Sequence, residues 1–77
     1  MITRVMVELD HPSSKMSDDA RVIGNILGEG YRVFHDDGNI FVDVHESDNA
    51  VEEVRHKLDL VCVGCLCYDW DDETNLD

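Results

Sequence analysis

The stretch that decides the fold of this chain runs from Tyr31 to His45 and reads YRVFHDDGNIFVDVH. Two segments rich in β-branched and aromatic residues flank Asp37-Gly38, a dipeptide typical of a two-residue type I′ turn, in which both central residues have positive φ. A turn of this length fixes the pairing of the two strands, because partners can be counted outward from it, beginning with Asp36 opposite Asn39. The sequence therefore predicts a β-hairpin with a single register.

Side chains alternate between the two faces of a strand, so this register also sorts the hairpin into two surfaces. One surface is apolar and carries Tyr31, Val33, Ile40, Val42 and Val44. The other surface places Phe34 directly opposite Phe41 and brings Arg32 opposite Asp43, which makes them candidates for an ion pair. Two opposed aromatic rings on a polar face have two interpretations. Either another part of the chain covers them, or they bind a partner.

Length and charge exclude several classes of function. A single domain of 77 residues buries only about 60% of its unfolded surface, which leaves little interior for a deep active site, so we do not expect an enzyme. Eighteen acidic residues against six basic ones give a net charge of −12. Such a charge repels nucleic acid and anionic membranes and favours basic partners. Asp exceeds Glu and Arg exceeds Lys, a balance also expected of a halophilic protein whose charge serves solvation only.

The acidic residues are concentrated in two stretches without any Lys or Arg, residues 36–53 and residues 69–77, which together account for the whole net charge. The first stretch contains Asp36, Asp37, Asp43, Glu46, Asp48, Glu52 and Glu53. Uncompensated carboxylates attract a cationic surface. We therefore predict that these seven residues bind a partner, together with Phe34 and Phe41 of the hairpin.

The cysteines are expected to be packed thiols in a cytoplasmic protein. No apolar run approaches the roughly 18 residues that cross a bilayer, and the start of the chain lacks the pattern of a signal peptide. Cys62, Cys65 and Cys67 are then reduced thiols rather than a disulfide framework. In an extended strand Cys62 and Cys65 point to opposite faces, which disfavours a tetrahedral metal site. We predict small buried thiols, no metal and no cofactor.

The remaining elements follow from periodicity and capping signals. Residues Ile2–Leu9 alternate in polarity and predict a strand with one buried face. Ser17 is a candidate N-cap for a first helix, and Ser47 is a candidate N-cap for a second one. The β-rich run Leu60–Tyr68 predicts the last strand. Residues 69–77 are too polar and charged to pack, so we expect a flexible acidic tail.

The order strand, helix, strand, strand, helix, strand predicts an α+β fold of the ferredoxin-like βαββαβ type, with a four-stranded antiparallel sheet and two helices on one face. The single domain would span residues 1–68. The apolar face of the hairpin would meet the helices, and the face that carries Phe34 and Phe41 would be open. Arg4, Met6 and Glu8 of the first strand would share that open face. Exposed patches of this kind usually mark a partner, and a homodimer through the open face would cover it.

One segment resembles a known family. The run Leu9–Val33, LDHPSSKMSDDARVIGNILGEGYRV, has a strand that ends at Asp10-His11-Pro12 and an apolar helix after it. In this respect it resembles the first half of an ACT-type regulatory domain, and the length of the chain and the order of its elements also fit. The resemblance implies a regulatory module that senses a small molecule.

The absence of catalytic motifs, the small size and the acidity together resemble the nucleic-acid-mimicking inhibitors that phages use against host defence or DNA-handling proteins. Carboxylates at alternate strand positions lie about 6–7 Å apart, a spacing that can imitate the phosphates of a nucleic acid strand. Our leading hypothesis is a non-enzymatic inhibitor that occupies a basic nucleic-acid-binding site on a larger protein. The alternatives are the ACT-like sensing module and a halophilic housekeeping domain.

Overall fold

The hairpin forms with the register counted from its turn. In a computed structural model of the chain, which describes residues 1–70, β2 (Tyr31–Asp36) and β3 (Asn39–His45) pair in antiparallel fashion at every predicted position. Asp37 and Gly38 have φ values of 50° and 78°, the left-handed conformation of both central residues in a type I′ turn. The predicted turn and the predicted register are therefore confirmed.

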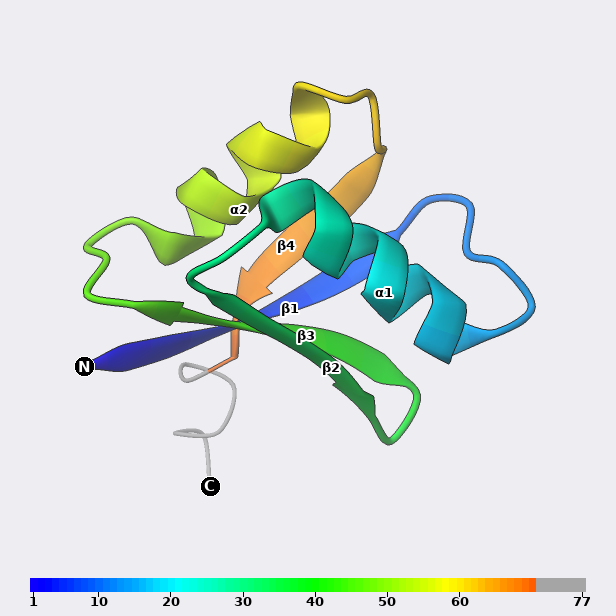
Figure 1. Cartoon of the computed structure of the whole chain (residues 1–77), viewed down its shortest axis with the longest axis horizontal. Coiled ribbons are helices and arrows are strands. Elements are labelled where there is room, and N and C mark those ends of the chain that lie inside the picture. Colours follow the sequence, from blue (N-terminus) through cyan, green and yellow to red (C-terminus); the bar gives the residue numbers. More distant parts are fainter. Residues whose placement is uncertain (71–77) are drawn as a thin grey trace.

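The other elements complete the ferredoxin-like arrangement that the sequence predicts (Figure 1). They are β1 (Ile2–Leu9), α1 (Met16–Leu27), α2 (Ala50–Asp59) and β4 (Cys65–Asp69). All neighbouring strands are antiparallel, in the order β2-β3-β1-β4 across the sheet. Both helices cover the same face of this sheet. Within residues 1–70, neither helix is long and apolar enough to cross a membrane.

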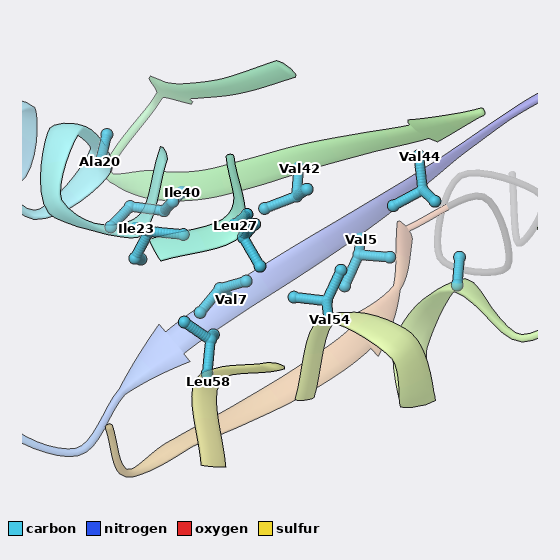
Figure 2. Close-up of a cluster of buried hydrophobic side chains, with 11 residues drawn as sticks. Val5, Val7, Ala20, Ile23, Leu27, Ile40, Val42, Val44, Val54 and Leu58 are labelled. Atoms are coloured by element: carbon cyan, nitrogen blue, oxygen red, sulfur yellow. The ribbon is translucent and has the colours of Figure 1, made fainter. Parts of the chain in front are cut away.

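The hydrophobic core lies between the sheet and the two helices (Figure 2). It is built from alternate residues of the two central strands, which point to one face, and from helix residues about one turn apart, which share a stripe. The buried cluster consists of Val5, Val7, Ala20, Ile23, Leu27, Ile40, Val42, Val44, Ala50, Val54 and Leu58. The strand periodicity that predicted a half-buried sheet therefore also decides which side of the sheet the helices occupy.

Helix α1 begins earlier than its predicted cap. Ser17 lies inside the helix, and Lys15 is the N-cap residue. The Lys15 main-chain carbonyl accepts the first helical hydrogen bonds, from the N–H groups of Asp18 and Asp19. The preceding loop supports this start, because the Ser13 hydroxyl oxygen accepts the Lys15 N–H at 3.2 Å and the Asp19 carboxylate accepts the Ser13 N–H at 3.0 Å. Loop contacts thus replace the side-chain cap that we predicted.

Helix α2 begins later than predicted. Its N-cap residue is Asn49, whereas Ser47 lies two residues before that cap. The Ser47 hydroxyl accepts the Asn49 N–H at 3.2 Å and also hydrogen-bonds the Glu53 carboxylate at 3.2 Å. The serine therefore organises the approach to the helix and is not its cap.

The last strand is shorter than the run Leu60–Tyr68 that predicted it. The Leu58 carbonyl accepts the N–H of Val63 at 3.0 Å, which folds the chain into a turn beyond α2 and places Cys62 at a φ of 61°. Cys62 is exposed there, so the prediction that it is a buried thiol is wrong. Strand β4 ends at Asp69, one residue past the predicted domain boundary. From residue 71 onward, the predicted flexible tail lies outside the described residues.

The turn can be tested with two glycine substitutions that have opposite expected signs. Gly38→Ala should lower the free energy of unfolding by about 1 kcal/mol, because an L residue is strained at this positive φ. Gly24→Ala lies inside α1, where an added Cβ would meet Val33 Cβ at an ordinary 3.8 Å, so it should raise the free energy of unfolding by up to about 1 kcal/mol. Urea denaturation measures both. Equal changes in the free energy of unfolding of the two variants would contradict the turn geometry.

Candidate functional site

The face of the sheet that points away from the helices carries two neighbouring rows of side chains. The charged row crosses three strands and consists of Arg32, Asp43 and Arg4. The apolar row crosses all four strands and consists of Phe34, Phe41, Met6 and Tyr68. This open face brings together the two predicted hairpin pairs and the residues of β1 that we expected beside them.

Asp43 is held inside the charged row. Its two carboxylate oxygens accept hydrogen bonds from Arg4, from Nε at 2.8 Å and from Nη2 at 3.2 Å. The predicted partner Arg32 lies farther away, with Nη1 3.8 Å from Oδ2. The Asp43 side chain is only 5% exposed, so it is far less accessible to a partner than the other acids of the first stretch that lie on the surface. Counting from the hairpin turn cannot reveal this burial, because Arg4 arrives from β1 through long-range pairing.

The two phenylalanines are in contact and differ in exposure. Their ring centroids lie 5.4 Å apart, and the guanidinium carbons of Arg4 and Arg32 each lie 4.9 Å from the Phe34 centroid. Phe41 is buried, and the Trp70 ring packs edge-on against it at 5.0 Å. Contact with another part of the chain therefore explains why the Phe41 ring lies on this face, while Phe34 stays partly exposed. A homodimer through this face remains a prediction.

The exposed acidic residues of the first stretch gather at opposite ends of β3. Asp36 and Asp37, the hairpin-tip acids, lie at the turn. Glu46, Asp48 and Glu52, the helix-start acids, lie where the chain leaves β3 and enters α2, and all three are exposed. A seven-residue strand separates the two groups by about 23 Å. The predicted acidic surface is thus two surfaces.

A hollow of about 350 Å³ lies at the start of α2. Asp48 and Glu52 line it together with Asp69, a residue that we assigned to the tail and that β4 brings here. Glu46 accepts a hydrogen bond at 2.6 Å from the amino group of Met1, a residue that lines the hollow. Nothing in the local sequence indicates the approach of Asp69, because the pairing of β1 with β4 creates it.

Glu53, the remaining acid of the first stretch, is turned toward the protein. Its carboxylate accepts hydrogen bonds from the Tyr31 hydroxyl and from the Ser47 hydroxyl. Burial of the Tyr31 ring and its hydrogen bond to this carboxylate raise the pKa of Tyr31 to about 12. Glu53 therefore joins β2 to α2 and is less accessible to a partner than the helix-start acids.

Cys65 and Cys67 share one face of β4, as their spacing predicts, and their sulfur atoms lie 3.8 Å apart. Burial raises the pKa of both thiols, that of Cys67 to about 12, so both stay protonated at neutral pH. Among residues 1–70, no three side chains of the kinds that bind metal ions come together. The expectation of a protein without metal or cofactor remains a prediction.

Comparisons of this chain with protein-family models, with curated proteins and with solved structures found no match. The resemblance of the run Leu9–Val33 to an ACT-type domain therefore remains a prediction as well.

The buried carboxylate in the charged row can be tested by charge removal. Asp43→Asn should lower the free energy of unfolding by about 1–3 kcal/mol, because it takes the negative charge from between two arginines and weakens a bidentate interaction. Asp36→Asn, at an exposed position of the neighbouring strand, is the matched control and should change stability by no more than about 0.5 kcal/mol. Urea denaturation at low salt measures both. If Asp43→Asn leaves the free energy of unfolding unchanged, the ion pairs do not stabilise the sheet.

The contact between Tyr31 and Glu53 predicts a loss of stability at high pH. The pKa of Tyr31 is about 12 in the folded protein and about 10 in an unfolded chain, so the unfolded state loses this proton first. The stabilisation of the folded protein that results from the raised pKa of Tyr31 is complete below about pH 10. It disappears as the pH approaches 12. Tyr31→Phe should remove that part of the pH dependence.

The same contact can be followed by phenolate absorbance in a Tyr68→Phe background, which leaves Tyr31 as the only tyrosine. Glu53→Gln should then lower the pKa of Tyr31, because the negative charge beside the hydroxyl is removed. An unchanged titration would mean that Glu53 does not contact this hydroxyl in solution.

Proposed function

We propose that this chain is a non-enzymatic inhibitor that acts in the cytoplasm by occupying a basic nucleic-acid-binding site on a larger protein, in the manner of phage nucleic-acid mimics. The observation that carries this proposal is the distribution of ion pairs. Arg4 and Arg32 both pair with the buried Asp43, whereas the carboxylates at the two ends of β3 form two exposed surfaces rich in negative charge, where Glu46 and Glu52 have only exposed ion-pair partners. A cationic partner is attracted to such a surface.

The helix-start acids are the preferred contact in this proposal. Asp48, Glu52 and Asp69 converge on one hollow from the start of α2 and from β4, so a lysine or arginine of the partner can enter between carboxylates. Glu52 is paired with Arg55 at 2.7 Å, but both side chains are at least half exposed. Exposed ion pairs contribute at most about 1 kcal/mol. A partner's arginine can therefore replace Arg55 at little cost.

The non-enzymatic part of the proposal is supported by the protonation of the packed groups. Tyr31, Cys65 and Cys67 have raised pKa values, and their protons are therefore held more tightly at neutral pH. A general base or an activated nucleophile requires a pKa near or below the working pH. These three groups are suited to packing and hydrogen bonding rather than to proton transfer.

The proposal is tested with two double variants that change the net charge equally. Asp48→Asn with Glu52→Gln removes two helix-start acids, and Asp36→Asn with Asp37→Asn removes both hairpin-tip acids. A partner is first captured on the immobilised chain from nuclease-treated host extract, and the release of a labelled DNA duplex from that partner is then measured. The helix-start variant should lose about 10-fold or more in affinity, since charge-assisted hydrogen bonds are removed. The hairpin-tip variant should lose less.

Salt distinguishes this function from charge that serves solvation only. Inhibition by surface complementarity should weaken steeply as ionic strength rises, because exposed charges are screened. A halophilic domain would instead need molar salt for folding and would show no displacement of the duplex. If the duplex and this chain occupy the partner together, or if both double variants bind as the parent does, nucleic-acid mimicry is wrong.

A further inference from the structure

A second cavity, of about 200 Å³, lies at one end of the hydrophobic core. The loop after β1, the start of α1 and the turn of the hairpin lie together at this end of the molecule (Figure 1). The apolar part of its wall consists of Val7, Leu9, Pro12, Met16 and Ile40. The remainder is formed by Glu8, Asp19, Gly38 and Asn39. The cavity is therefore an opening of the core whose wall includes one buried carboxylate, that of Asp19.

Asp19 is the unusual residue of this wall. It is a carboxylate in the first turn of α1 that is only 9% exposed. Its Oδ2 atom accepts the Ser13 N–H, whereas Oδ1 accepts no hydrogen bond from the described residues. Residues 1–70 contain no buried side-chain oxygen without a hydrogen-bond partner. Oδ1 is therefore accessible to solvent, and it belongs to a residue that lines the cavity.

The chemistry of this wall selects one class of ligand. An anion would be repelled by Asp19 and by the nearby Glu8, and a neutral apolar molecule would leave the Asp19 carboxylate desolvated without a donor. A hard metal ion prefers six or more oxygen ligands, which the apolar wall does not provide. A cation with an apolar body satisfies both parts of the wall, because its charge meets the carboxylate and its body meets the aliphatic side chains.

We propose that this cavity binds a small organic amine in its ammonium form. The ammonium group donates a hydrogen bond to Asp19 Oδ1, and an aliphatic body of about four to six carbon atoms packs against Leu9, Met16 and Ile40. The site is separate from the helix-start acids and contains none of the predicted partner-binding residues. It therefore stands or falls independently of the proposed inhibitor function.

The test compares 3-methylbutan-1-amine with 3-methylbutan-1-ol at constant ionic strength, by following the backbone amide signals of the whole chain in NMR titrations. The amine should produce saturable shifts centred on Ser13, Asp19, Gly38 and Ile40. The alcohol, which has the same body without the charge, should bind about 10-fold or more weakly. Methylammonium, which has the charge without the body, should also bind more weakly and so controls for general attraction to an acidic protein.

Two neighbouring acids give a matched pair of variants. Asp19→Asn keeps an oxygen that can accept the Ser13 N–H but removes the charge, so it should reduce affinity for the amine about 10-fold or more and leave that for the alcohol unchanged. Asp18→Asn changes the net charge equally at an exposed residue that is paired with Arg21. It should retain the affinity of the parent. Leu9→Phe, which enlarges a side chain of the apolar wall and narrows the cavity, should weaken amine and alcohol alike.

Four outcomes would overturn the proposal. The amine could produce no saturable shifts, which would make the cavity a gap in packing only. Its shifts could spread over the helix-start acids with no preference for the cavity. The alcohol could bind as well as the amine, or the Asp18→Asn variant could lose as much affinity as Asp19→Asn. Intact chemical-shift dispersion in each variant confirms that it is folded and makes a loss of binding interpretable.

Discussion

The left-handed turn at Asp37-Gly38 is the constraint on which the rest of this structure depends. Because it permits one register, it sends Ile40 and Val42 into the core and leaves Phe41 and Asp43 on the opposite face. A slip of one residue would exchange these two sets, placing a carboxylate in the core and valines in solvent. The sheet then extends this arrangement, since β1 pairs with β3 in the register that brings Arg4 to Asp43.

The charge of the molecule is arranged around that same strand. At its middle, two arginines converge on a buried carboxylate. At its ends, the hairpin-tip acids and the helix-start acids are exposed. A partner attracted by these acids can therefore bind without disturbing Asp43 or the contact between Phe41 and Trp70. This separation allows an acidic protein to present its charge and still keep a stable open face.

The elements that could be predicted correctly from the sequence are those whose signals lie close together in the chain. The hairpin could be predicted in full because its turn, its alternation and its pairing lie within fifteen residues. The predicted caps Ser17 and Ser47 were wrong because helix starts also depend on the path of the preceding loop, here held by the hydrogen bond between Ser13 and Asp19. The last strand was predicted too long, since β-branched composition gave no indication of the turn that the Leu58 carbonyl stabilises.

By itself the sequence determined the order of the elements, the hairpin register, the side of the sheet that meets the helices and the excess of negative charge, because periodicity and composition are properties of the chain alone. Only the tertiary structure decided which acids are accessible. It buried Asp43 beneath Arg4, turned Glu53 toward Tyr31 and brought Asp69 to the helix-start acids. It also opened a cavity beside Asp19. All of these features arise because strands and helices that are distant in sequence pack together. Such contacts leave no local pattern in the sequence.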